Sequence, residues 1–344
     1  MSDTSAPTRG ASTLHDVARE AGVSLATASR VLNGSTRKVA ESYRERVETA
    51  AEKLGYTANL SAQATARGTS AIVALLVADI ADPYFSQLAS GVARGADEAG
   101  LVVTIAITER DPQREVKLVR ALRGQRPRGL ILAASRTEGP DAVGLQSELD
   151  AFAGMGGRVV MLGPGTGDTR SVAVDNRGGA AALGTELAGL GYRDAIVIAA
   201  SEGIRTSDDR VAGFTEGFTA AGGEVRDVRR GGFTRDAGYA TTQELLSGDV
   251  PAGTLIFGIS DVVAIGVMSA VRDAGRRVGD DIAVAGFDDI ATGRDIRPGL
   301  TTVCVPLEDL GYRALHAALE PEWDASEPPL ALEVVVRGST PRRD

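Results

Sequence analysis

Side chains that can read the edge of a DNA base pair gather between residues 25 and 30. Thr27, Ser29 and Arg30 supply two hydroxyl groups and a guanidinium. The apolar Leu25 and the small Ala26 stand next to them in the sequence. Hydroxyl and guanidinium groups hydrogen-bond base edges and phosphates, and an apolar side chain can meet a thymine methyl group in the major groove. A shared helix face would turn these residues into a DNA contact surface.

The spacing of apolar residues places this segment on the second of three short helices. Apolar positions at i, i+3, i+4 and i+7 predict a helix over residues 14–21, with Thr13 as its N-cap and Gly22 at its end. A second helix is predicted over about 25–32 and a third from near Glu41. Two helices joined by a tight glycine turn and followed by a third form the helix-turn-helix layout. A generic three-helix bundle is the alternative.

These residues also carry a family resemblance. The head of the chain contains TLHDVAREAGVSLATASRVLNG, followed by YRERVETAAEKLGYTAN. Both runs closely resemble the DNA-binding head of the LacI/GalR family of bacterial transcription regulators. The resemblance implies that the second helix is the recognition helix, that Leu25 and Ala26 set operator choice, and that His15, Asn33 and Arg44 hold backbone phosphates.

The following segment, residues 58–68, is similar to the family's hinge helix, which folds on the operator and wedges a leucine into the minor groove. Here Thr65 stands at the wedge position and Ala58 at the usual proline. A threonine is smaller and polar, so we expect it to unstack a base step less well than leucine. The implied DNA-binding set comprises Leu14, His15, Leu25, Ala26, Thr27, Ser29, Arg30, Asn33, Arg44, Asn59, Ala62, Gln63 and Thr65.

The rest of the chain alternates short apolar strands with amphipathic helices, which predicts parallel sheets covered by helices on both faces. Nine strands are expected, within residues 71–79, 101–108, 129–135, 158–163, 171–175, 195–201, 224–230, 254–260 and 282–289. The alternation of strands and helices in the first half of this region is repeated in the second half. We therefore predict a small all-α helix-turn-helix head joined to an α/β domain of two Rossmann-like lobes with a cleft between them.

Polar and aromatic residues follow several of these strands, and ligands of open α/β sheets bind at the carboxyl ends of strands. The family resemblance extends to this region, whose implied fold is that of type I periplasmic sugar-binding proteins. It implies that Arg210 and Asp288 hydrogen-bond a small-molecule effector and that Phe233 stacks on it. The full implied set is Asp82, Tyr84, Phe85, Arg210, Phe233, Ser260 and Asp288.

A carboxylate, a guanidinium and an aromatic platform suit a polyhydroxylated ring such as a sugar, because vicinal hydroxyls need paired donors and acceptors. A purine or nucleoside is the alternative effector. Asp288 could instead be a structural cap after a strand, and Phe233 an ordinary core residue. Serine at position 260, where the family often has asparagine, lacks the two-sided bonding of an amide, so the effector could differ from a common hexose.

Domain boundaries follow from these patterns. We expect a DNA-binding domain at 1–57, a hinge helix at 58–68, and an effector-binding and dimerisation domain at 69–344. Within the last, lobe 1 covers about 69–170 and 304–325, and lobe 2 about 171–303 and 326–340. Partners are a near-palindromic double-stranded operator and a second copy of the chain, which dimerises through lobe 1. The tail lacks a heptad run, so no tetramerisation helix is expected.

Composition excludes several function classes. Residues 1–68 carry net charge +2 and the remainder −11, so only the head suits a polyanion. One cysteine and two histidines exclude a disulfide scaffold, a Cys/His zinc site and a Cys–His nucleophile. The glycines at 163–167 lack the spacing of a dinucleotide loop. We therefore expect that the protein is not an enzyme and that it binds no cofactor or metal ion.

The apolar runs are too short for a membrane span, and the N-terminus lacks the apolar stretch of a secretory signal. A cytoplasmic, nucleoid-associated regulator is predicted, and the resemblance implies that it is a repressor. A binding protein of the periplasmic type would share the body of the chain, but it would need an export signal and no DNA-binding head.

Overall fold

A computed structural model describes residues 12–32, 39–57, 70–133, 143–163, 169–324 and 328–343. The chain divides into two compact units, Met1–Ala71 and Ile72–Asp344, called here the head and the body. Each unit has buried apolar side chains of its own, so each is described separately.

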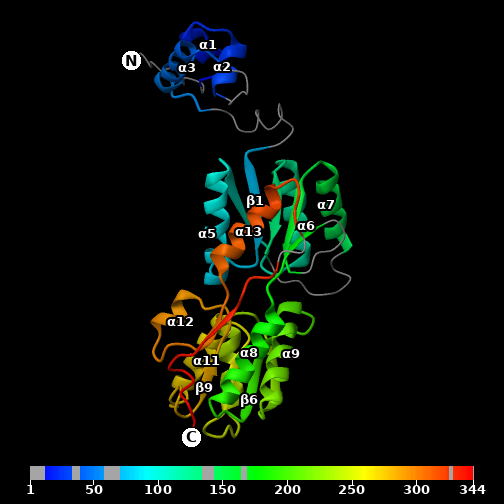
Figure 1. The fold of residues 1–344 in the computed structure, drawn as a ribbon, viewed down its shortest axis with the longest axis vertical. Coiled ribbons are helices and arrows are strands. Elements are labelled where there is room, and N and C mark those ends of the chain that lie inside the picture. Colours follow the sequence, from blue (N-terminus) through cyan, green and yellow to red (C-terminus); the bar gives the residue numbers. More distant parts are fainter. Residues whose placement is uncertain are drawn as a thin grey trace, which may run out of the picture. The chain divides into compact units, whose positions relative to one another are not determined.

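The head contains the three predicted helices, α1 (Leu14–Ala21), α2 (Leu25–Leu32) and α3 (Glu41–Leu54) (Figure 1). Thr13 caps α1 through a reciprocal pair of bonds with Asp16, and Gly22 ends it with φ of 61°. That left-handed conformation favours glycine and makes the tight turn into α2. The head core is formed by Val17, Ala18, Ala21, Ala28, Val47, Ala50 and Ala51.

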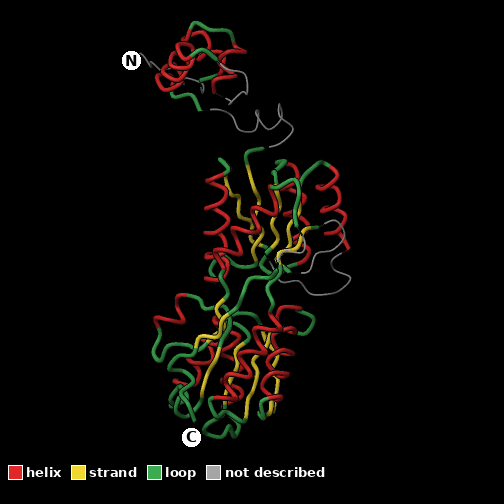
Figure 2. Tube along the Cα trace, viewed as in Figure 1, coloured by secondary structure: helices red, strands yellow, loops and turns green. Residues whose placement is uncertain are grey.

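The first lobe of the body is built on a five-stranded parallel sheet with strand order β2-β1-β3-β4-β5. Its strands are β1 (Ile72–Val77), β2 (Val102–Ile107), β3 (Gly129–Leu132), β4 (Arg158–Leu162) and β5 (Arg170–Val172). Its helices are α5 (Pro83–Glu98), α6 (Pro112–Gly124), α7 (Val143–Gly154) and α13 (Leu307–Leu319). Figure 2 shows helices flanking the strands of this lobe.

The second lobe repeats the plan on a four-stranded parallel sheet with strand order β7-β6-β8-β9. Its strands are β6 (Asp194–Ala200), β7 (Glu224–Gly231), β8 (Leu255–Gly258) and β9 (Ala283–Ala285). Its helices are α8 (Asn176–Gly189), α9 (Arg205–Ala220), α10 (Arg235–Leu246), α11 (Asp261–Asp273) and α12 (Ala291–Asp295). All nine strands expected from the sequence are present, and the two-lobed α/β fold is confirmed.

Two short strands that the sequence did not predict join the lobes. β10 (Thr302–Cys304) and β11 (Glu333–Val335) form an antiparallel pair that contacts α8 of the second lobe. From β10 the chain passes into α13, which lies beside α5 in the first lobe (Figure 1). A β-carbon at Gly311 would come within 2.1 Å of the Leu88 carbonyl oxygen, so glycine allows this close approach.

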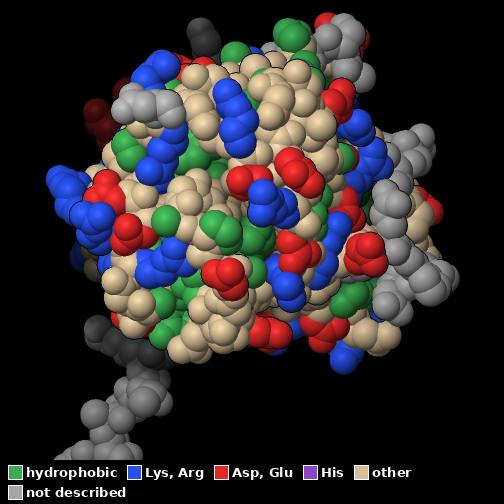
Figure 3. Space-filling model, turned by 90° about the horizontal axis from the view of Figure 1, so that it is seen from below, with side chains coloured by type: hydrophobic (Ala, Val, Ile, Leu, Met, Phe, Trp, Pro, Cys, Tyr) green, Lys and Arg blue, Asp and Glu red, His purple; other side chains and the backbone are tan. Residues whose placement is uncertain are grey.

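The surface of the body mixes both signs of charge. On the face shown in Figure 3, basic and acidic side chains alternate and hydrophobic ones are scattered. Exposed ion pairs of the second lobe include Arg226–Asp194 at 2.6 Å and Arg277–Asp280 at 3.1 Å. Such pairs add little stability in water, so their main effect is to balance charge locally.

Candidate functional site

The start of α2 presents several of the predicted DNA-reading side chains on the surface of the head. Leu25 is 38% exposed, and Ala26 and Arg30 are exposed as well. Ala28 is completely buried in the head core, which fixes the face of α2 that points outward. An exposed leucine beside a guanidinium matches what a major groove can accept.

The two hydroxyl residues of α2 are less exposed than their neighbours. The Thr27 hydroxyl lies 2.8 Å from the Ser24 hydroxyl, which also accepts a hydrogen bond from the Thr27 backbone N–H at 3.1 Å. Ser24 therefore caps α2, and Thr27 supports this cap in addition to facing the surface. Ser29 is half-buried.

The predicted phosphate-binding residues occupy different environments. His15 is exposed at the start of α1, and Arg44 is exposed on α3, where its Nε lies 3.8 Å from Glu41. Leu14 packs against the head core, so its side chain stabilises the head.

The other DNA-binding predictions lie outside the described residues. They are the hinge helix at 58–68 and the positions Asn33, Asn59, Ala62, Gln63 and Thr65. Their proposed contacts remain predictions from the sequence.

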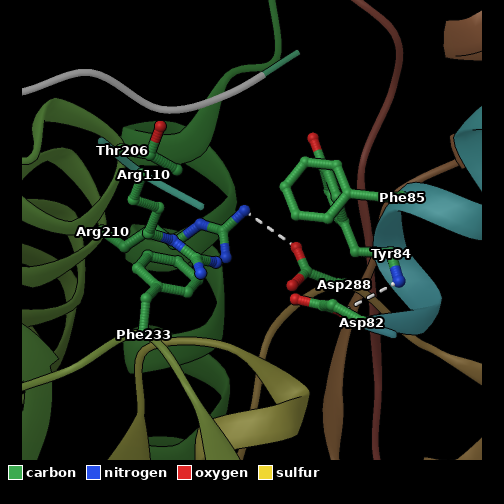
Figure 4. Close-up of a pocket in the computed structure, with 8 residues that line it drawn as sticks. All are labelled: Asp82, Tyr84, Phe85, Arg110, Thr206, Arg210, Phe233 and Asp288. Atoms are coloured by element: carbon green, nitrogen blue, oxygen red, sulfur yellow. Dashed lines mark hydrogen bonds and ion pairs between the residues drawn. The ribbon is translucent and has the colours of Figure 1, made fainter. Parts of the chain in front are cut away.

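In the body, side chains from both lobes converge on one cavity (Figure 4). Strand order reverses between β1 and β3 in the first lobe, and between β6 and β8 in the second. Ligands of such sheets bind at these switch points, outside the carboxyl ends of the strands. The cavity is lined by Asp82, Tyr84, Phe85, Arg110, Thr206, Arg210, Phe233 and Asp288.

Arg210, on α9, is held by three acceptors. Its guanidinium donates to Asn176 Oδ1 at 2.8 Å, to the Ile259 carbonyl oxygen at 3.0 Å and to Asp288 Oδ1 at 2.8 Å. The side chain is 2% exposed and lies over the ring of Phe287, 3.9 Å from its centroid. This network fixes the guanidinium at the cavity wall before any ligand arrives.

Asp288 completes the ion pair from the loop after β9. Burial raises its pKa to about 6, although the neighbouring Arg210 lowers it. Its backbone has a φ of 116°, a left-handed conformation that costs energy for a residue with a β-carbon. The Asp288 N–H donates to the Val303 carbonyl oxygen at 2.9 Å, so β10 holds the residue in this conformation.

Aromatic side chains face each other across the cavity. Tyr84 and Phe85 come from the start of α5 and make an edge-to-face contact with centroids 5.0 Å apart. Phe233 comes from the loop after β7 in the second lobe. The open space between these walls is about 30 Å³, which holds one or two water molecules. A ring-sized ligand therefore requires the lobes to part or the side chains to move.

Asp82 lines the cavity and also caps α5, because its Oδ1 accepts a hydrogen bond from the Tyr84 N–H at 3.0 Å. Burial raises the pKa of this carboxyl above its ordinary value, and the charges of Arg110 and Arg210 oppose the rise. One side chain thus ties the first turn of α5 to the cavity.

Ser260 does not line the cavity, although the sequence predicted that it would contact the ligand. It is 1% exposed at the start of α11, and its buried hydroxyl has no hydrogen-bond partner among the described residues. Next to it, Asp261 accepts hydrogen bonds from Thr302 Oγ1 at 2.6 Å and from the Ile290 N–H at 2.9 Å. Burial and the carboxylate of Asp288 raise the pKa of Asp261 to about 7.

Two cavity residues, Arg110 and Thr206, were not predicted. Arg110 lies three residues after the end of β2, so the rule that ligands bind beyond strand ends points to its loop but not to this side chain. Thr206 precedes Arg210 by one helical turn on α9 and shares its face, which is a weaker signal.

Two kinds of site are absent from the described residues. No group of three His, Cys, Asp or Glu side chains there is arranged to hold a metal ion. Within the same ranges, the helices are too short or too polar to span a bilayer.

Comparison with known families matches both units of the chain. The model for bacterial regulatory proteins of the lacI family matches residues 13–59, and the model for a periplasmic binding protein-like domain matches residues 185–340. The transcriptional repressor PurR of Erwinia tasmaniensis is 31% identical over 326 residues, which cover 94% of each chain.

Solved structures agree with this match. The lac repressor dimer bound to operator and the anti-inducer ONPF superposes with a TM-score of 0.83 at 25% identity, over 96% of this chain and all of that one. A complex of the transcriptional regulator CelR with cellobiose gives a TM-score of 0.67 at 30% identity, over 95% of this chain and 99% of that one. Each of these two matches therefore covers nearly the whole chain, head and body included.

Proposed function

The chain belongs to the LacI family of bacterial regulatory proteins, and we propose that it is a repressor whose operator affinity is set by a sugar bound between its two lobes. Members of this family are transcription regulators, and the chain is a DNA-binding regulator of that kind rather than an enzyme. The proposal adds the class of effector and the residues that bind it.

The convergence of Arg210, Asp288 and Phe233 on one cavity carries the proposal. A guanidinium and a carboxylate 2.8 Å apart offer donors and acceptors to neighbouring hydroxyl groups. The Phe233 ring gives a surface for the C–H face of a sugar ring. The relative CelR was solved with cellobiose, which favours the same ligand class here.

A purine is the second candidate. Tyr84 and Phe233 come from opposite lobes, and two aromatic rings can enclose a planar base as well as a sugar. The test of the proposal therefore includes both ligand classes.

Signal transmission follows from the place of Asp288. Its N–H is bonded to Val303, and β10 leads through Pro306 into α13 of the first lobe. A ligand that contacts Asp288 thus acts on a segment that joins the lobes. Effector control requires that the ligand bind the open and closed arrangements with different affinity. A change in the angle between the lobes would change the spacing of the two heads in a dimer, and it would order or melt the hinge at 58–68.

DNA recognition is assigned to α2 and its surroundings. We propose that Leu25, Ala26, Thr27, Ser29 and Arg30 read bases, and that His15, Asn33 and Arg44 bind phosphates. Residues 1–57 form the DNA-binding domain in this assignment, and 69–344 bind effector and dimerise. Such a regulator works in the cytoplasm on the nucleoid.

A homodimer is proposed through the first lobe, because a near-palindromic operator presents two half-sites. Strand β2 lies at the edge of the first sheet and exposes Val102 by 55% and Ile105 by 41%. Together with α5 and the segment after Pro306, this edge gives an apolar surface to a second copy. Ile105→Glu is expected to yield monomers by analytical ultracentrifugation; an unchanged dimer would exclude this edge from the interface.

The test is thermal unfolding of the full chain with a panel of neutral sugars, purines and nucleosides. A ligand at 100 times its dissociation constant adds about 2.7 kcal/mol of stability. Any stabilising sugar is then added to a complex with operator DNA selected from random sequence. Release of DNA by that sugar supports the proposal; stabilisation by a purine alone, or unchanged operator affinity, contradicts it.

A further inference from the structure

Arg110 enters the cavity from a turn whose backbone is unusual. The turn spans Thr108–Asp111, and the Asp111 N–H donates to the Thr108 carbonyl oxygen at 3.0 Å. Its two central residues, Glu109 and Arg110, have φ of 55° and 57°. Left-handed φ at both central positions defines a type I′ turn, which normally selects asparagine and glycine. Neither residue here is of that kind.

Contacts around the turn hold this strained backbone in place. The Glu109 N–H donates to the Ala78 carbonyl oxygen at 3.0 Å, which ties the turn to the end of β1. Asp111 caps α6 through the Gln113 N–H at 2.8 Å. Arg114 donates to the Ile107 carbonyl oxygen at 2.8 Å. Strain that persists because its surroundings enforce it is concentrated at functional sites.

The guanidinium of Arg110 crosses to the opposite lobe. Its central carbon lies 5.4 Å from the centroid of the Phe233 ring, the surface on which a ligand ring would stack. Figure 4 shows Arg110, Arg210 and Phe233 grouped on one side of the cavity. A sugar ring that stacks on Phe233 must therefore displace this guanidinium or lie against it.

Arg110 and Arg210 differ in how their charges are satisfied. Arg210 donates to three acceptors, one of them the carboxylate of Asp288. Arg110 has no ion pair with a carboxylate in the described part of the chain, and its contact there is the aromatic ring. A guanidinium has five N–H donors in a fork that matches a carboxylate or phosphate. Among the described residues, Arg110 therefore brings unused donors and an unpaired charge to the cavity.

The acidic groups near Arg110 do not pair with its guanidinium. Asp82 and Asp79 act on it by charge but lie beyond ion-pair distance. Asp82 is engaged as the cap of α5, and burial raises the pKa of its carboxyl. A ligand oxyanion would thus meet Arg110 as the available partner at this end of the cavity.

We propose that Arg110 determines effector specificity by pairing with a carboxylate or phosphate on the sugar, so that the effector is an acidic sugar. This inference rests on the proposed function, because it places the ligand in the same cavity. Arg210 and Asp288 bind the hydroxyl groups, Phe233 supports the ring, and Arg110 holds the oxyanion. A neutral sugar would leave Arg110 without an anionic partner.

Matched sugars test the proposal on the full chain. Glucose and galactose are compared with glucuronate, galacturonate and their 6-phosphates by thermal unfolding, with inorganic phosphate as the control for a general anion effect. At least one acidic sugar is expected to bind at least tenfold more tightly than its neutral parent. A response to the uronate or to the 6-phosphate identifies the source of the oxyanion.

Two variants connect this preference to the residue. Arg110→Gln is expected to reduce the acid-to-neutral preference at least tenfold, and Arg110→Lys, which keeps the charge, to retain part of it. Arg128→Gln, an exposed position in the same lobe, removes one positive charge away from the cavity and should leave the preference unchanged. Unaltered operator binding verifies that each variant is folded.

The outcomes separate this inference from the proposed function. Equal binding of neutral and acidic sugars, or an equal loss of both in Arg110→Gln, overturns the role of Arg110 and leaves the sugar effector standing. Failure of every sugar, neutral or acidic, contradicts the sugar effector and this inference together.

Discussion

The head and the cavity position their functional side chains by opposite routes. In the head, the predicted base-reading residues lie within six consecutive positions of α2, and several are exposed. In the cavity, the residues come from segments as distant in sequence as Asp82 and Asp288, and both members of the central ion pair are buried. One site is local in the chain and the other exists only after both sheets have formed.

This difference predicts what a substitution damages. The exposed groups of α2 make few contacts within the protein, so their loss should affect DNA binding alone. Arg210 and Asp288 satisfy each other inside the body, so their loss should affect stability as well as ligand binding. Four substitutions test the contrast.

The largest effect is expected for Arg210→Met. At pH 8 the variant leaves the Asp288 carboxylate buried without its partner, which costs about 3–5 kcal/mol of the free energy of unfolding. Urea unfolding measures the loss, and the double variant Arg210→Met/Asp288→Leu should recover much of it. If Arg210→Met is as stable as the parent, the buried ion pair of the cavity contributes no more to stability than the exposed residues of the head do.

Asp261→Asn tests the buried acid behind the cavity. Its folded pKa of about 7 lies above the ordinary aspartate value of 3.8, so the folded state keeps a proton that the unfolded chain has lost. Stability should therefore fall as pH rises from about 4 to 7, by an amount on the order of 4 kcal/mol at most. The variant should show a weaker dependence when unfolding is measured at pH 5 and pH 8. An equal change in the free energy of unfolding between pH 5 and pH 8 in variant and parent would contradict the raised pKa of Asp261.

Arg30→Ala should weaken operator binding by about 1–3 kcal/mol, because it removes a guanidinium from the recognition surface. Its free energy of unfolding should change by less than about 0.5 kcal/mol, since the side chain is exposed. Fluorescence anisotropy with operator DNA and urea unfolding give the two values. A large loss of stability in Arg30→Ala would contradict the expectation that the exposed residues of α2 affect DNA binding alone.

The smallest effect is expected for Ser24→Ala, which removes the cap of α2. Loss of the Thr27 N–H bond should destabilise the head by about 1 kcal/mol and lower operator affinity. Ser24→Thr keeps the acceptor oxygen and serves as the matched control. Calorimetry of the full chain should show the change in the head transition only; a shift in the body would argue against independent units.

The head was almost completely predictable from its sequence. Thr13, Gly22 and the apolar spacing gave the helix boundaries, because caps and amphipathic faces are local properties. The nine parallel strands were predictable for the same reason, as short apolar runs bounded by turns. β10 and β11 were missed: each has three residues and is defined by its pairing with the other, which no local pattern records.

The cavity was predictable only in part. Six of the seven predicted effector residues line it, because they follow strands or match the family pattern. Ser260 follows a strand too, but its short side chain is enclosed at the start of α11. Arg110 was missed because glutamate and arginine are ordinary surface residues in a turn, and only the fold shows the left-handed backbone that directs this arginine at Phe233.

The small volume between the lobes has a consequence for kinetics. A space that holds one or two waters cannot admit a sugar, so the lobes must separate or the lining side chains must move before the ligand is bound. At high ligand concentration the observed association rate should then level off at the rate of opening, instead of rising in proportion to concentration. How fast the regulator responds to a changing supply of ligand would thus be set by the opening of this cavity and not by diffusion.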